Sequence, residues 1–97
     1  MTRKEVFKEL LIPELDYAQY WDDRRKSEDN PKFDKDKDVK AWLAWMKADL
    51  SRAFEAAYSG TDKSKALDYV RKVTALGVSC MMYNDTPARK QPFIVGE

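Results

Sequence analysis

The chain has 97 residues, of which 43% are hydrophobic and 12% aromatic, enough for a packed core and too many for a disordered protein. Its 18 Lys and Arg and 17 Asp and Glu leave a net charge of +1, which gives no electrostatic basis for binding bulk nucleic acid or an anionic membrane. No apolar run approaches the roughly 18 residues of a membrane span, and we expect no signal peptide at residues 1–4. We expect a cytoplasmic protein with a single helical domain over residues 1–97, small enough to favour a homo-oligomer.

The first expected element is a helix over residues 2–26. Thr2 and Glu5 stand three residues apart, the pattern of a capping box at a helix start. Pro13 interrupts the helical pattern, and the residue before a proline disfavours helical dihedral angles. We therefore expect a kink or a restart of the helix at Ile12.

A polar segment, residues 27–38, follows and predicts an exposed loop. Its Asp-Lys alternation from Asp34 resembles the start of a calcium-binding loop. The sixth position of that pattern should be Gly and is Val39, and the twelfth should be Glu and is Trp45. The charge alternation is therefore interpreted as a solvated surface.

A second helix is expected over residues 39–58. Asp38 is a plausible N-cap, and Ser59-Gly60 is a typical C-terminal signal. Apolar residues spaced three and four apart predict a wide apolar stripe along this helix. Its members are Val39, Trp42, Leu43, Met46, Leu50, Ala53, Phe54 and Ala57.

A third helix is expected over residues 63–84, with Thr61, Asp62 or Ser64 as its cap. Its apolar and small residues cover more than half of its circumference. This pattern predicts that the helix is central, or that it faces both the core and another subunit. Gly77 costs about 1 kcal/mol in a helix interior, which we interpret as a sign of close helix packing.

The tail, residues 86–97, contains two prolines and is not helical throughout. Its Phe93-Ile94-Val95 run could add a short strand or dock on a neighbour, and a frayed end is the alternative. The whole pattern predicts an all-α fold: a small helical bundle of three main helices with an irregular C-terminal tail.

The absence of histidine removes His-based catalysis. The single cysteine, Cys80, excludes an internal disulfide and is expected to be a small buried hydrophobe. A Mg²⁺ site built from carboxylates stays open, and no other cofactor is expected. Its candidate ligands are Glu14, Asp22 and Asp23.

The densest cluster of candidate binding residues runs from Tyr17 to Arg25. Its rings could stack on a base while Arg24 or Arg25 pairs with a phosphate. The alternative is that Trp21 belongs to the core and the charges form local ion pairs. The candidate ligand-binding residues over the whole chain are Tyr17, Trp21, Arg24, Arg25, Trp45, Arg71, Lys72 and Arg89.

The two basic residues of the third helix have several interpretations. Lys72 shares a helical face with Ala75, Leu76 and Ser79, so its stem could simply cover apolar surface. The alternative for Arg71 or Lys72 is pairing with a phosphate, or with a carboxylate on the first helix.

The order of these features resembles a group of small helical proteins carried by bacteriophages, some of them MazG-like, after the nucleoside-triphosphate pyrophosphohydrolases. The resemblance covers most of residues 14–89. It rests on the acidic-aromatic stretch from Glu14, the Asn30-Pro31 pair, the Trp42-Leu-Ala-Trp45 run and the last helix with its Arg71-Lys72 pair. Those pyrophosphohydrolases hold Mg²⁺ with Glu-Glu-x-x-Glu and Glu-x-x-Asp motifs, which this chain lacks.

The resemblance implies a phage-type accessory protein. We expect it to bind a small nucleotide-like ligand without turnover, as a counter-defence protein that sequesters a signal of the host, and we favour binding over enzyme activity. One alternative is a protein–protein inhibitor or adaptor that docks on a host protein. The other is a divergent Mg²⁺-dependent nucleotide pyrophosphohydrolase.

Overall fold

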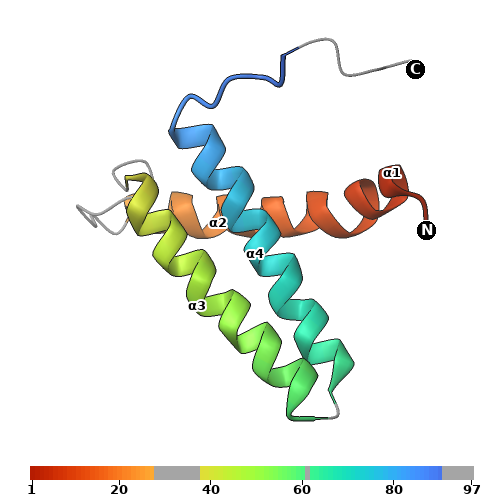
Figure 1. Cartoon of the computed structure of the whole chain (residues 1–97). Helices are drawn as coiled ribbons and strands as arrows, with labels where there is room; N and C mark the ends of the chain where they lie inside the picture. Colours follow the sequence, from red (N-terminus) through yellow and green to blue (C-terminus); the bar gives the residue numbers. More distant parts are fainter. Residues whose placement is uncertain (28–37, 61, 91–97) are drawn as a thin grey trace.

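The computed structural model describes residues 1–27, 38–60 and 62–90, which are mostly helical with no strand among them. One long helical segment is formed by α1 (Arg3–Val6), the π-helical turn η1 (Phe7–Leu11) and α2 (Ile12–Ser27). It crosses a hairpin made by α3 (Val39–Tyr58) and α4 (Lys63–Tyr83), as Figure 1 shows. The all-α prediction is confirmed, and each helix end lies within one residue of its predicted position.

Three of the predicted helix caps are present. The backbone N–H of Thr2 donates to Glu5 Oε1 at 2.7 Å, and the N–H of Glu5 donates to Thr2 Oγ1 at 3.1 Å, completing the capping box. Asp38 caps α3 and Asp62 caps α4, each accepting a bond from the backbone N–H three residues on, at 2.8 Å and 2.9 Å. These bonds satisfy donors that every helix start leaves open.

Pro13 does not interrupt the helix, because the turn before it is π-helical. The N–H of Ile12 donates to the carbonyl of Phe7, five residues earlier, and Ile12 stays helical with φ −56° and ψ −48°. A π turn holds one extra residue, which relieves the clash between a proline ring and the carbonyl four residues before it. At Ile12 the helix thus changes from π-helical to α-helical turns, where the sequence predicted a kink or a restart. The expectation that Ile12 leaves helical dihedral angles is wrong.

The two helices of the hairpin end differently. α3 ends at Tyr58 as predicted, but Gly60 does not adopt a positive φ. After α4, Asp85 has a φ of 46°, and the N–H of Thr86 donates to the carbonyl of Met81 at 3.4 Å. This bond and the left-handed residue make a Schellman-type end, with aspartate where glycine is usual.

α4 is the central helix, because it packs against α3 along its length and against α2 and η1 on another side. Gly77 faces α3: a Cβ added there would lie 3.4 Å from Cε of Met46. That neighbour is the flexible end of a side chain and not the backbone of α3, so the interpretation of this glycine as a mark of close helix packing stays a prediction.

The core of the single chain is small. Its buried hydrophobic residues among those described are Trp42, Ala53, Ala66 and Ala75. Much of the stripe predicted on α3 is exposed, because α4 covers only one side of it. The exposed members of that stripe are Val39, Leu43, Leu50, Phe54 and Ala57. Cys80 is half-buried rather than fully enclosed.

Two predicted features fall beyond what the structure describes. The charged run from Asp34 lies outside the described residues except for its last member, Asp38, which caps α3. The Phe93-Ile94-Val95 segment also lies outside them.

Candidate ligand-binding cavity

A cavity of about 290 Å³ lies where α2 crosses the α3–α4 hairpin. The three helices contribute similar shares of its wall, which is mostly apolar with a few charged groups. The lining residues are Glu14, Tyr17, Ala18, Trp21, Arg25, Trp42, Trp45, Asp49, Lys72, Ala75, Leu76 and Ser79. All three tryptophans of the chain are among them.

α2 supplies its share of the wall from one face. Glu14, Tyr17, Trp21 and Arg25 are three or four residues apart, so the helical period alone brings their side chains to one side. The rings of Tyr17 and Trp21 meet edge to face with centroids 6.2 Å apart. This local contact fixes the relative orientation of two aromatic side chains that line the cavity.

α3 supplies a stacked aromatic pair. The ring of Trp42, which is only 1% exposed, stacks on Trp45 at 5.7 Å with an interplanar angle of 16°. It also stacks at 6.2 Å on Tyr83 from the end of α4. Trp45 is 38% exposed, so part of it stays accessible while Trp42 holds it in place. The result is a rigid aromatic wall.

α4 supplies the lysine. The Nζ of Lys72 lies 3.9 Å from a carboxylate oxygen of Asp68 and 5.3 Å from the ring centroid of Tyr69. An ion pair at that distance on an exposed side chain contributes little. The ammonium group can therefore turn towards a bound anion at small cost.

Both carboxylates of the cavity wall pair with arginines that do not line it. Oε1 of Glu14 lies 2.9 Å from Nε of Arg71, and Oδ1 of Asp49 lies 2.7 Å from Nη1 of Arg52. The carboxylate side chains are 14% and 11% exposed, so these charges are mostly removed from water and need such partners. The wall also carries two cations, Arg25 and Lys72, beside these two acids.

Five of the eight predicted ligand-binding residues meet in this cavity: Tyr17, Trp21, Arg25, Trp45 and Lys72. The other three are placed elsewhere. Arg24 lies 5.5 Å from the ring centroid of Trp21 and donates to the hydroxyl of Tyr20 at 3.1 Å. Arg71 bridges Glu14 and Asp68, which is the carboxylate pairing to the first helix that the sequence left open. Arg89 follows α4 and does not line the cavity.

The three carboxylates considered for Mg²⁺ are not brought together. Asp22 is 3% exposed and accepts a hydrogen bond from the hydroxyl of Tyr83. Asp23 accepts from Nε2 of Gln19 at 2.9 Å on the surface, whereas Glu14 faces the cavity. Over the described parts of the chain, no three acidic or cysteine side chains are grouped as metal ligands would be.

The sequence reasoning did not place Trp42 or Asp49 at the site. Trp42, Trp45 and Asp49 are spaced three and four residues apart, so the helical period was a usable signal that they share a face. From the sequence, Trp42 is predicted as a member of the apolar stripe, and only Trp45 of the two is a ligand-binding candidate. Trp42 in fact does both: it is buried and its ring forms part of the cavity wall.

No family model, curated protein or solved structure matches this chain. None of the described helices is long and apolar enough to cross a membrane.

Proposed function

We propose that the protein binds a small anion with a planar aromatic group, a nucleotide, in the cavity between α2, α3 and α4, and does not convert it. The observation that carries the proposal is the convergence of four aromatic side chains and two cations on one cavity. Those side chains are Tyr17, Trp21, Trp42, Trp45, Arg25 and Lys72.

The aromatic part of the wall suits a nucleobase. Stacking of a base on an aromatic side chain contributes about 1–3 kcal/mol and tolerates any base, because every base has a π face. Trp45 is half-exposed and already held by its stack on Trp42, so little conformational entropy is lost when a base covers it. The volume of about 290 Å³ is at the lower end for ligand pockets and matches a mononucleotide-sized group.

The cations suit the phosphate. Lys72 is exposed and its ammonium group lies 3.9 Å from a carboxylate oxygen of Asp68, so it can reach a bound phosphate. Charge-assisted hydrogen bonds to phosphate are about twice as strong as neutral ones. The oxygens of Glu14 and Asp49 can accept hydrogen bonds from exocyclic amines of a base, while Arg71 and Arg52 compensate their charge.

Binding without turnover is supported by how the polar groups of the wall are engaged. Each carboxylate of the wall is already engaged by an arginine, Glu14 by Arg71 and Asp49 by Arg52. The chain has no histidine, and Cys80 is not among the residues of the wall. A protein that binds a nucleotide and keeps it intact lowers its free concentration, which is the sequestering role that the resemblance to phage-encoded proteins implies.

Tryptophan fluorescence tests the proposal directly, since every tryptophan of the chain lines the cavity. We would titrate the purified protein with nucleoside mono-, di- and triphosphates and with linear and cyclic dinucleotides, and follow quenching and thermal stability together. Ligand at 100 times its Kd should stabilise the fold by about 2.7 kcal/mol.

Two variants make the test specific. Lys72→Ala should weaken binding about tenfold or more, which corresponds to about 1.4 kcal/mol. Lys65→Ala is the matched control, since it removes an exposed lysine two turns earlier on α4 that does not line the cavity. The proposal fails if no nucleotide changes the fluorescence at millimolar concentration, or if both variants bind as the wild type does.

A further inference from the structure

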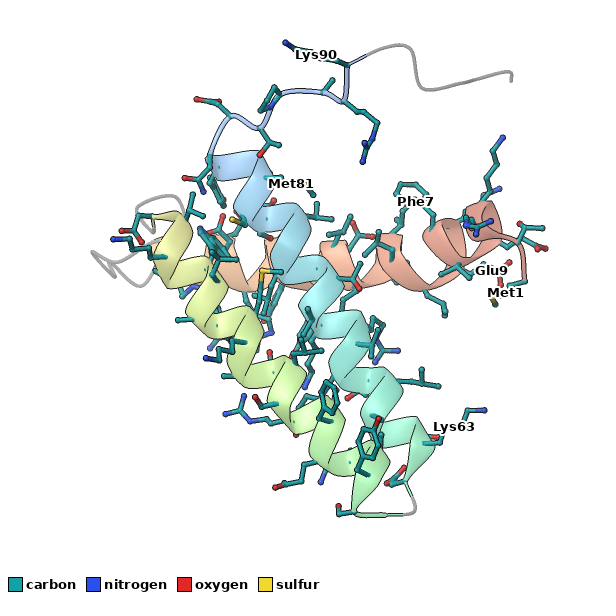
Figure 2. The ribbon with its side chains drawn as sticks, in the orientation of Figure 1. Met1, Phe7, Glu9, Lys63, Met81 and Lys90 are labelled. Atoms are coloured by element: carbon teal, nitrogen blue, oxygen red, sulfur yellow. The ribbon has the colours of Figure 1, made fainter. Side chains whose placement is uncertain are left out.

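The flank of α4 that faces away from the cavity carries a row of exposed, uncharged side chains. The row consists of Leu67, Val70, Thr74 and Met81, all exposed and spaced as one helical face. Figure 2 labels Met81 on α4. At 100° per residue its members point about 140–180° away from Lys72, which lines the cavity. In Figure 1, α3 and the α1–α2 segment occupy other sides of α4.

A second exposed row runs beside it along α3. Its members, Val39, Leu43, Leu50, Phe54 and Tyr58, are four or seven residues apart. Leu43 is 54% exposed and Phe54 57% exposed, although both are large and apolar. The rings of Phe54 and Tyr58 stack with centroids 5.4 Å apart, so this end of the row is ordered. We call the two rows together the apolar face.

The apolar face is grooved. Between the two rows lies a hollow of about 550 Å³, with Phe54 on one wall and Leu67 on the other. The buried alanines Ala53 and Ala66 form part of its lining, so the two backbones can be approached closely there. Leu67 also lines a neighbouring hollow of about 410 Å³ that reaches Leu10 of η1. The two rows act as ridges and the hollow between them as a groove, which is the surface shape that packs against a second pair of helices.

We propose that the apolar face binds the same face of a second copy of this chain, so that two α3–α4 hairpins form a four-helix bundle. Eight of the nine side chains of the two rows are 46–83% exposed, and at roughly 150 Å² or more for a large side chain they expose together on the order of 700 Å². That area is above the roughly 300–600 Å² of the largest patch on a typical monomer. It is close to the roughly 800 Å² that each partner contributes to a stable interface.

A second copy is the occupant that the chain's own core requires. Three of the four buried hydrophobic residues are alanines, so one copy alone removes few large side chains from water. A partner that completes the core must be present whenever the chain folds. Other copies of the same chain meet this condition, because they are made together with it. Two cations lie within the face: Lys47 shares the side of α3 that carries its row, and Lys63 lines the hollow beside Asp62. A pairing of the face with itself must therefore keep these lysines apart or next to an acidic side chain.

The first test is the mass of the full chain in solution, by light scattering after size exclusion at about 1–100 µM. A dimer, or an assembly of dimers, of the 11.3 kDa chain is expected. Leu50→Glu should give a monomer, or a chain unable to fold. Tyr20→Glu, which changes an exposed aromatic residue of α2 outside the face, should leave the mass unchanged. A wild-type monomer at 100 µM, whether or not another partner binds it, overturns the proposal.

Cross-linking keeps the test decisive where Leu50→Glu fails to fold. In a Cys80→Ser background, a single cysteine at Phe54 (Phe54→Cys) should form covalent dimers with a short bis-maleimide, and one at Tyr20 (Tyr20→Cys) should not. Dimers that cross-link equally from both positions, or only from Tyr20, would place the interface elsewhere.

Discussion

The ion pair between Glu14 and Arg71 provides the sharpest prediction about how α2 is held against α4. Replacement of Arg71 with methionine keeps most of the apolar stem and removes the guanidinium group. The carboxylate of Glu14 then stays at 14% exposure with its 2.9 Å partner gone. We expect Arg71→Met to lower the free energy of unfolding.

The magnitude follows from the burial of the two groups. Exposed pairs contribute about 0–1 kcal/mol, whereas removal of one partner from a fully buried pair costs about 3–5 kcal/mol. Glu14 is mostly buried but Arg71 is 42% exposed, so solvent screens the pair from one side. A loss of about 1.5–2 kcal/mol lies between these limits. For a chain of this length it lowers the Tm by roughly 6–16 °C.

The assay is a double-mutant cycle with Glu14→Gln, Arg71→Met and the double variant, measured by urea unfolding. All four proteins are measured at one protein concentration, because the stability of an oligomer depends on its concentration. The coupling energy should be about 1 kcal/mol. Lys72→Met is the matched control: it removes the adjacent cation, whose nearest carboxylate is 3.9 Å away, and should cost under about 0.5 kcal/mol. A coupling energy below about 0.3 kcal/mol, or equal losses from Arg71→Met and Lys72→Met, would refute the reasoning.

Three further predictions concern local features of the helices. Asp85→Gly should raise the free energy of unfolding by about 0.5–1 kcal/mol, because Asp85 has a φ of 46° that glycine adopts without strain; unchanged or lower stability in urea would contradict this. Gly77→Ala should be neutral or stabilising by up to about 1 kcal/mol, since the new Cβ meets only the flexible end of Met46 at 3.4 Å. A lower Tm of this variant would contradict the prediction and show that the Met46 side chain cannot move aside. Hydrogen bonds from the Thr2 backbone and side chain lower the pKa of Glu5 in the folded chain. The ionised carboxylate therefore stabilises the first turn of α1 at pH values above the pKa of Glu5 in the unfolded chain. This stabilisation is lost as the pH falls through the pKa of Glu5 in the folded chain. Amide exchange in α1 should therefore speed up in acid in the wild type, whereas a Thr2→Val variant should show a smaller pH effect.

The helices themselves could be predicted from the sequence because the interactions that define them are short-range. A cap such as Asp38 bonds to a backbone group three residues away, and the apolar period is set by neighbours on the same helix. The same locality puts Tyr17, Trp21 and Arg25 on one face of α2 at helical spacing, and these three candidate ligand-binding residues all line the cavity. The π turn before Pro13 was missed because proline rules describe ordinary α-helical turns.

The tertiary structure decided which side of each helix meets a neighbour. The apolar stripe of α3 is wider than the surface that α4 covers, so Trp42 is buried while Leu43, one residue on, is exposed. Because α2 crosses the hairpin, Arg71 pairs with Glu14 of α2 whereas Lys72 lines the cavity. The local sequence pattern does not indicate which of these two adjacent residues takes which role. Local hydrogen bonds and side-chain period fix the helices within a few residues. Their packing depends on contacts between residues far apart in the chain, such as Asp22 and Tyr83, and only the folded arrangement specifies those.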